Sequence, residues 1–179
     1  MVGVVGRVLV IGGARSGKSA YAESLVSGQQ AVTYVATGPT RPDDAEWTAR
    51  VAAHKLRRPP GWETVETTAL AAVFREQTER ALVVDSVTAW LAAAMDDAGS
   101  WTEDAGAPER LRVVVDELLE AWGGTTAVVA VTDEVGQGVV PETTSGRLFR
   151  DELGALNQRL AAAADDVWLV TAGLPLRLK

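Results

Sequence analysis

The residues best suited to chemistry form a glycine-rich stretch near the N-terminus that ends in a lysine and a serine. In order they are Gly12, Gly13, Ala14, Arg15, Ser16, Gly17, Lys18 and Ser19. This is the spacing of a phosphate-binding loop (P-loop), whose backbone N–H groups surround phosphate oxygens at the positive end of the following helix. Lys18 would reach the β- and γ-phosphates, and the Ser19 hydroxyl would bind Mg²⁺. The alternative is a chance glycine-rich turn, which the preceding apolar run and the following helical pattern disfavour.

A second candidate is the carboxylate that closes an apolar run. Ala81 to Val84 is followed directly by Asp85. This is the form of a Walker B strand, whose aspartate serves Mg²⁺ directly or through water. Any buried strand can end in aspartate, and Asp85 could instead cap the helix expected over 86–95. The P-loop in the same chain favours the metal role.

The third candidate is the only histidine, His54, which lies in the most basic stretch of the chain. Arg50 is four residues earlier and would share a helix face with it. An imidazole is available as a nucleophile or base near neutral pH. Spacing alone also allows an ordinary solvated helix end, whose cations match the negative end of the helix dipole.

Alternating apolar runs and helical patterns supply the elements that must position these residues. Strands are expected at 7–11, 31–36, 62–66, 81–85, 127–131 and 167–171, and the tail 174–179 can add an antiparallel edge strand. Helices are expected at 20–26, 43–57, 68–80, 86–95, 108–122 and 145–164. This order predicts an α/β fold of the P-loop NTPase type, a mostly parallel sheet flanked by helices, in a single domain of residues 1–179.

Composition narrows the class of function. The 17 lysines and arginines against 24 acidic residues give a formal charge of −7, which argues against a nucleic-acid binder. There is no cysteine, so thiolate metal sites and a cysteine nucleophile are excluded. No apolar run reaches the roughly 20 residues of a membrane span, and the N-terminus is too short for a signal-peptide core, so a cytoplasmic location is expected.

Taken together, the motifs resemble those of one family along nearly the whole chain. The first half contributes the P-loop, Tyr34-Val35-Ala36-Thr37-Gly38, the Asp43-Asp44 pair, Arg50 to Lys55, Arg58-Pro59, Trp62, Thr64, Glu66 and Val84 to Thr88. The second half contributes Glu134-Val135-Gly136, Val139 to Glu142, Phe149 to Asp151, Asn157 to Leu160 and Ala164-Asp165. The chain resembles the bifunctional adenosylcobinamide kinase and adenosylcobinamide-phosphate guanylyltransferases of cobalamin biosynthesis. Asp133 departs from a position where relatives often carry asparagine.

The resemblance implies two reactions and assigns residues to them. A nucleoside triphosphate, ATP or GTP, phosphorylates adenosylcobinamide, and GTP then guanylylates that phosphate with release of pyrophosphate. His54 matches the guanylylated histidine of the family, and Lys18 would bind the phosphates of the nucleotide. The resemblance places further residues at the nucleotide: Ala36, Thr37, Gly38, Lys55, Leu56, Arg57, Arg58, Glu66 and Asp85. Glu66 could accept hydrogen bonds from guanine, and Asp85 would serve Mg²⁺ together with Ser19.

Two other functions remain open on the sequence. The chain could be a single-activity P-loop kinase for another small alcohol, with no role for His54 in catalysis. It could also be a nucleotide-binding switch that uses turnover to change shape. The expected partners are small molecules, and the resemblance suggests a homo-oligomer, a trimer, whose subunit interface could complete the site.

Overall fold

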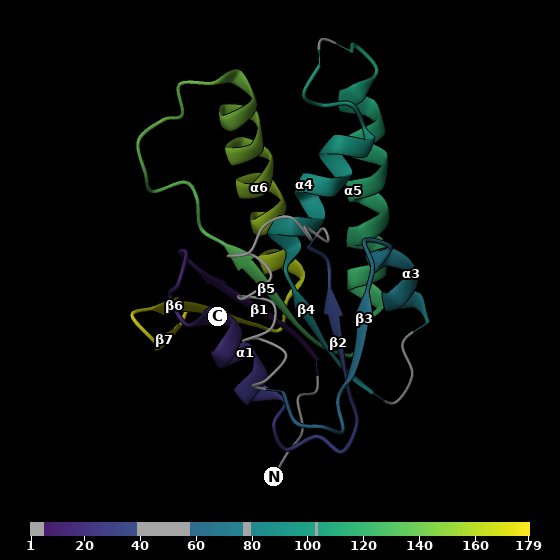
Figure 1. Ribbon diagram of the computed structural model, residues 1–179, viewed down its shortest axis with the longest axis vertical. Helices are drawn as coiled ribbons and strands as arrows, with labels where there is room; N and C mark the ends of the chain where they lie inside the picture. The colour runs from purple at the N-terminus through teal and green to yellow at the C-terminus, as the bar shows by residue number, and fades with distance from the viewer. Residues whose placement is uncertain (1–5, 39–57, 77–79, 103) are drawn as a thin grey trace.

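The computed structural model describes residues 6–38, 58–76, 80–102 and 104–179, and its strands form one sheet (Figure 1). The strands are β1 (Gly6–Gly12), β2 (Val32–Ala36), β3 (Glu63–Glu66), β4 (Ala81–Asp85), β5 (Ala127–Asp133), β6 (Asp166–Thr171) and β7 (Leu174–Arg177). Within the described residues their order across the sheet is β3-β2-β4-β5-β1-β6-β7. The pairs are parallel except β6 with β7, which is antiparallel. Both the mostly parallel sheet and the antiparallel edge strand are therefore confirmed.

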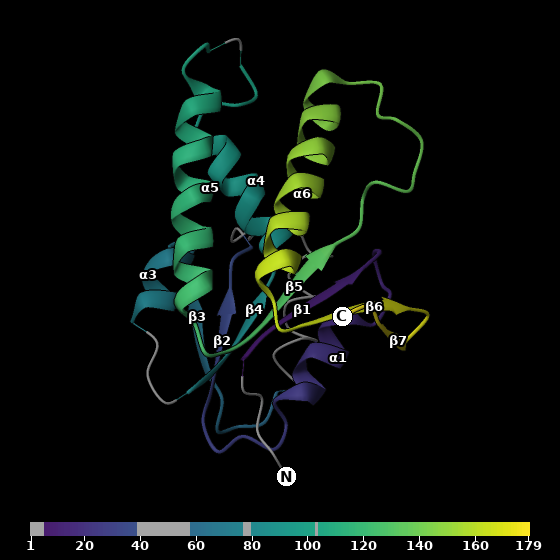
Figure 2. The same cartoon turned by 180° about the vertical axis from the view of Figure 1, so that it is seen from behind.

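Helices cover both faces of this sheet. They are α1 (Lys18–Leu25), α3 (Leu70–Arg75), α4 (Val87–Asp97), α5 (Ala107–Gly124) and α6 (Thr144–Ala163). In β1, Val8 and Val10 pack with α1, whereas Leu9 belongs to the cluster that α3 to α6 form on the other face. Because successive side chains of a strand point to opposite faces, a continuous apolar strand serves both cores at once. The upper parts of α5 and α6 extend beyond the ends of the strands (Figures 1 and 2).

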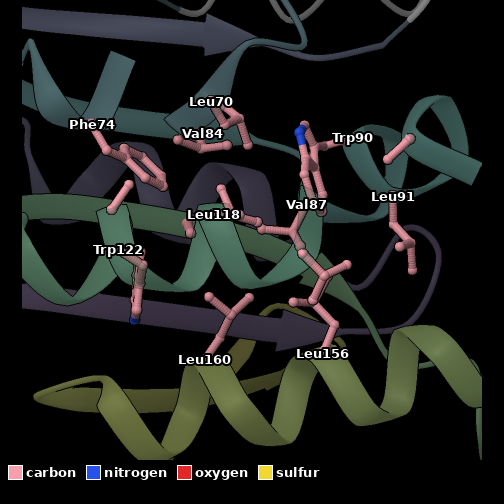
Figure 3. Packing of buried hydrophobic residues seen from close by; sticks show 14 of the residues in the cluster. Leu70, Phe74, Val84, Val87, Trp90, Leu91, Leu118, Trp122, Leu156 and Leu160 are labelled. Atoms are coloured by element: carbon pink, nitrogen blue, oxygen red, sulfur yellow. The ribbon is translucent and has the colours of Figure 1, made fainter. Parts of the chain in front are cut away.

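The larger core joins β4 to all four helices of its face. Figure 3 shows side chains of this cluster, with Val84 of β4 facing residues of α3, α4, α5 and α6. Trp122 of α5 is fully buried and lies against Phe74 of α3, with ring centroids 5.9 Å apart. Aromatic contacts of this kind add to the free energy gained by burying apolar area. The core therefore fixes β4, and with it Asp85 at its carboxyl end.

The structure corrects three details of the sequence-based prediction. The helix expected over 68–80 is shorter, because α3 ends at Arg75 with Glu76 as its C-cap. β5 extends to Asp133, two residues past the end of the strand expected at 127–131. Ser86, not Asp85, caps α4 by accepting a hydrogen bond from the backbone N–H of Ala89. The helix expected over 43–57 lies outside the described residues.

No helix in the described part of the chain is both long enough and apolar enough to cross a bilayer.

Candidate functional site

The P-loop connects β1 to α1, at the carboxyl end of the strand. Its turn is closed by a hydrogen bond from Ser16 N–H to the Gly13 carbonyl, 3.2 Å long. The N-cap of α1 is Gly17, which has no side chain to cap this end of the helix. The Lys18 N–H, the first of the helix, donates to Ser16 Oγ within the loop at 3.4 Å, the long end of the hydrogen-bond range. A helix N-terminus without a strong cap is suited to binding phosphate oxygens.

Two glycines of the loop are required by its geometry. A Cβ on Gly12 would lie 2.5 Å from Ser16 Oγ and 2.6 Å from the Val170 carbonyl oxygen. Gly17 has a φ of +94°, which L-residues with side chains rarely adopt, and its Cβ would meet the backbone of Gly173. These contacts explain why residues 12 and 17, which approach β6 and the turn after it, are glycines.

The P-loop lysine is held by a carboxylate on the neighbouring strand. Lys18 Nζ lies 2.6 Å from Asp133 Oδ1, with 12% and 25% of the two side chains exposed. The same ammonium group donates to the Gly13 carbonyl at 3.3 Å. Asp133 stands opposite Gly12 in the pairing of β1 with β5, so strand register alone brings the carboxylate beside the P-loop.

A buried polar network fixes the backbone of Asp133. Its N–H donates to Thr88 Oγ1 at 2.8 Å, and its carbonyl accepts from Asn157 Nδ2 at 3.1 Å. Thr132, which is fully buried, donates to Asn157 Oδ1 at 2.8 Å. Because buried polar groups are costly unless paired, these bonds join α4, β5 and α6 at a defined position.

Asp85 ends β4 on the same edge of the sheet. Its Oδ2 accepts a 2.7 Å hydrogen bond from the hydroxyl of Tyr34, a residue of β2 that is only 2% exposed. Burial, with the nearby charge of Asp85, raises the pKa of Tyr34, which keeps the hydroxyl protonated as a donor. β5 lies between β4 and β1, so the two strands that carry Asp85 and the P-loop are separated by the strand of Asp133.

Thr37, at the end of β2, connects that strand to the start of α4. Its hydroxyl donates to the Ser86 carbonyl at 2.5 Å and accepts from the Ser86 N–H at 2.9 Å. The side chain is 1% exposed. Thr37 therefore supports the turn after Asp85, while Ala36 and Gly38 on either side of it are half-buried.

Arg58 and Glu66 lie farther from the P-loop than the two aspartates. The Arg58 guanidinium stacks over the Tyr34 ring, 3.3 Å from its centroid, and donates to Thr64 Oγ1 at 3.0 Å. Glu66 is exposed at the end of β3, the outermost strand on that side. Four strand intervals separate β3 from β1, roughly 19 Å at ordinary strand spacing. The arginine, the tyrosine and Asp85 thus form one continuous chain of contacts.

Four of the residues that the sequence places at the nucleotide lie outside the described residues. They are His54, Lys55, Leu56 and Arg57. The residues that flank this part of the chain are Gly38, which follows β2, and Arg58, which stacks on Tyr34 of β2. Both ends of the intervening segment are thus attached to the strand next to Asp85.

The donor set suits Mg²⁺ only if the nucleotide completes it. Ser19 and Asp85 offer the hydroxyl and carboxylate oxygens that this ion prefers. No group of three or more histidine, cysteine or acidic residues able to hold a metal occurs in the part of the chain that the structure describes. Mg²⁺ bound to one or two protein oxygens, with phosphate oxygens and waters as its other ligands, fits this arrangement.

Sequence reasoning missed two residues of the site. Asp133 lies beyond the strand expected at 127–131 and receives no role from the sequence, although it follows an apolar run and one threonine at the end of β5. Tyr34 was noted only as part of a motif, yet it contacts both Asp85 and Arg58. A carboxylate at a strand end could have identified Asp133, but no sequence signal specifies the partner of a buried tyrosine.

Comparison with known proteins gives a family match over most of the chain. Residues 8–178 match the family described as CobU, cobinamide kinase / cobinamide phosphate guanyltransferase. The bifunctional adenosylcobalamin biosynthesis protein CobU of Salmonella typhimurium is 40% identical, over 96% of this chain and 99% of that protein. The corresponding protein CobP of Pseudomonas aeruginosa is also 40% identical, over 97% of each chain.

Solved structures with similar folds are P-loop ATPases with low sequence identity. A prototypical ATPase from the type III secretion system of pathogenic bacteria superposes with a TM-score of 0.58 and 17% identity. That alignment covers 93% of this chain and 51% of the ATPase, so the present chain spans about half its length. The assembled ATPase EscN of enteropathogenic E. coli gives a TM-score of 0.53 at 16% identity, over 94% and 43% of the two chains. These likenesses concern the fold alone.

Proposed function

Because the chain belongs to the cobinamide kinase / cobinamide phosphate guanyltransferase family, we propose that it performs both reactions at the carboxyl edge of its sheet, with His54 as the guanylylated residue. The observation that carries this proposal is the meeting of the P-loop, Asp133 and Asp85 on three adjacent strands. A triphosphate held there has its β- and γ-phosphates at Lys18 and the N-terminus of α1.

In the kinase reaction, the hydroxyl oxygen of adenosylcobinamide attacks the γ-phosphorus of ATP or GTP. An oxygen–phosphorus bond forms as the bond to the nucleoside diphosphate breaks; the diphosphate leaves with the electron pair and the hydroxyl proton is released. The P-loop amides and Lys18 stabilise the charge that develops on the phosphate oxygens. Ser19 and Asp85 would hold Mg²⁺, which neutralises part of the triphosphate charge when bound. The hydrogen bond from Tyr34 orients the Asp85 carboxylate for this purpose.

In the guanylyl transfer, an imidazole nitrogen of His54 attacks the α-phosphorus of GTP. A nitrogen–phosphorus bond forms as the bond to pyrophosphate breaks, and pyrophosphate leaves with the electron pair. An oxygen of adenosylcobinamide phosphate then attacks the same phosphorus and releases the histidine. Support for His54 comes from its match to the family motif and from its flanking residues, because Arg58 contacts Tyr34 and Tyr34 contacts Asp85. Glu66 is proposed to select guanine.

A product assay tests the proposal. The purified protein is incubated with adenosylcobinamide and either ATP alone or ATP with GTP, and the corrinoids are separated by chromatography. ATP alone should give the phosphate, and added GTP should give adenosylcobinamide-GDP. Lys18→Ala should abolish both products. Formation of the phosphate without the GDP product would show a kinase that lacks the guanylyl transfer. Nucleotide hydrolysis without either product would support the switch or a kinase for another small alcohol.

The quaternary structure is part of the same proposal. We expect a homo-oligomer, a trimer by family resemblance, and a cytoplasmic protein. Light scattering of the purified protein measures the assembly directly, and a monomer at working concentration would contradict it.

A further inference from the structure

The contact between Lys18 and Asp133 raises a question of charge. Nζ and Oδ1 are 2.6 Å apart, so the lysine expected to bind phosphate is already neutralised by a carboxylate. Any triphosphate that enters the P-loop must therefore draw Lys18 away from Asp133, or bind with both groups still close together. In either case the negative charge of Asp133 stays at the phosphate end of the site.

Asp133 is the less mobile member of this pair. Its N–H and carbonyl are bound by Thr88 and Asn157, and its strand pairs with β1 at Gly12. Further along, the Glu134 N–H donates to the Gly12 carbonyl at 3.2 Å. Lysine, in contrast, carries its charge on a flexible four-carbon stem. On nucleotide binding, the lysine can therefore change partners while the carboxylate remains beside the P-loop.

A fixed carboxylate affects the two forms of a nucleotide differently. Metal-free triphosphate presents its full negative charge to Asp133, and like charges in close contact are strongly unfavourable. Magnesium-bound triphosphate has part of that charge neutralised, and Mg²⁺ usually keeps waters that can donate hydrogen bonds to a carboxylate. We propose that Asp133 is a specificity-determining residue that makes the P-loop reject metal-free triphosphate. This inference rests on the proposed function, which places the triphosphate at the P-loop.

The test is equilibrium binding of a fluorescent GTP analogue to wild type and Asp133→Asn, once with EDTA and once with saturating Mg²⁺. Asparagine keeps the size of the side chain and its oxygen acceptor for Lys18 but removes the charge. In EDTA the variant should bind at least about tenfold more tightly than wild type, since one like charge has been removed. With Mg²⁺ its affinity should change by less than about threefold, because the metal already offsets that charge. An unchanged ratio between the two conditions would overturn the proposal.

Two further variants separate the outcomes. Asp97→Asn removes the same charge from an exposed position of α4 and should leave both affinities at the wild-type values. Asp133→Ser also lacks the carboxylate and serves if the asparagine variant does not fold, as judged by circular dichroism. If wild type fails to bind the magnesium complex, the proposed function fails. If wild type binds it and neither Asp133 variant alters the discrimination, the role given to Asp133 alone is wrong.

Discussion

The hydroxyl of Tyr34 donates a 2.7 Å hydrogen bond to Oδ2 of Asp85, so a buried side chain of β2 orients the carboxylate at the end of β4. The ring of Tyr34 also carries the guanidinium of Arg58, which stacks on its face. Tyr34 thus contacts both the proposed metal-binding carboxylate and Arg58. Removal of the Tyr34 hydroxyl should weaken Mg²⁺ binding more than nucleotide binding.

Tyr34→Phe tests this relationship, because it deletes the hydroxyl and keeps the ring beneath Arg58. The Mg²⁺ concentration needed for half-maximal activity should rise about 10-fold, since partners that orient metal ligands commonly contribute that much. The KM for GTP at saturating Mg²⁺ should change little. Tyr21→Phe is the matched control, because its ring packs against Trp168 and not at Asp85. An unaltered Mg²⁺ dependence in Tyr34→Phe would show that Asp85 does not need this hydrogen bond.

Asp85 and Ser86 are adjacent but should fail in different ways when mutated. Asp85→Asn should lower both activities about 10- to 100-fold through the metal, with the free energy of unfolding within about 0.5 kcal/mol of wild type. Ser86→Ala removes the cap of α4 and should cost about 1 kcal/mol of stability. Urea unfolding and product assays on both variants measure the two effects. If Asp85→Asn is strongly destabilised but keeps normal activity per folded molecule, Asp85 stabilises the fold and does not bind the metal.

Asn157 should be important for stability, because it bonds to both Thr132 and the backbone of Asp133. Asn157→Leu leaves the buried Thr132 hydroxyl and the Asp133 carbonyl without this partner. The free energy of unfolding should fall by about 2 kcal/mol or more, the cost of unpaired buried polar groups. Gln158→Ala, an exposed change on the same helix, is the control. Equal urea midpoints for the two variants would mean that the network contributes nothing.

The pairing of Asp165 with Arg7 should make the free energy of unfolding depend on pH. Its side-chain and backbone hydrogen bonds from Arg7 lower its pKa to about 2. A carboxyl group whose pKa is depressed on folding stabilises the protein above its unfolded pKa, about 3.9, and loses that contribution as the pH falls towards 2. Asp165→Asn should therefore be less stable than wild type near neutral pH, and the difference should shrink as the pH falls and disappear only below about pH 2.

The magnitude of this effect is limited by solvent. The Asp165 side chain is 46% exposed, so the difference near neutral pH should be about 1 kcal/mol or less. Urea unfolding of wild type and variant across this pH range measures it. A difference that grows as the pH falls would contradict the sign derived above.

Much of the fold could be predicted because its signals are local. The apolar run before the P-loop, the helical pattern after Pro108 and the glycines of the P-loop each specify their own element. The end of α3 was missed, since propensity continues past Arg75 and only packing decides where a short helix stops. Extending β5 to Asp133 depended on pairing with β1, which no local pattern records.

The candidate site could be predicted from the sequence only in part. The P-loop and Asp85 follow motifs with fixed spacing, and the structure brings them to one edge of the sheet. The contacts of Asp133 and Tyr34 join residues far apart in the sequence, at separations of 115 and 51 positions. Pairings over such distances arise from sheet order and strand register, so a single sequence does not reveal them.

The most direct test of the account is peptide mapping by mass spectrometry after incubation of the protein with GTP and Mg²⁺, quenched at alkaline pH. The account predicts one added GMP per chain on the peptide that contains His54, together with release of pyrophosphate. The adduct should be absent from His54→Ala and should disappear when adenosylcobinamide phosphate is supplied. GMP on another residue, or product formation by His54→Ala at the wild-type rate, would contradict it.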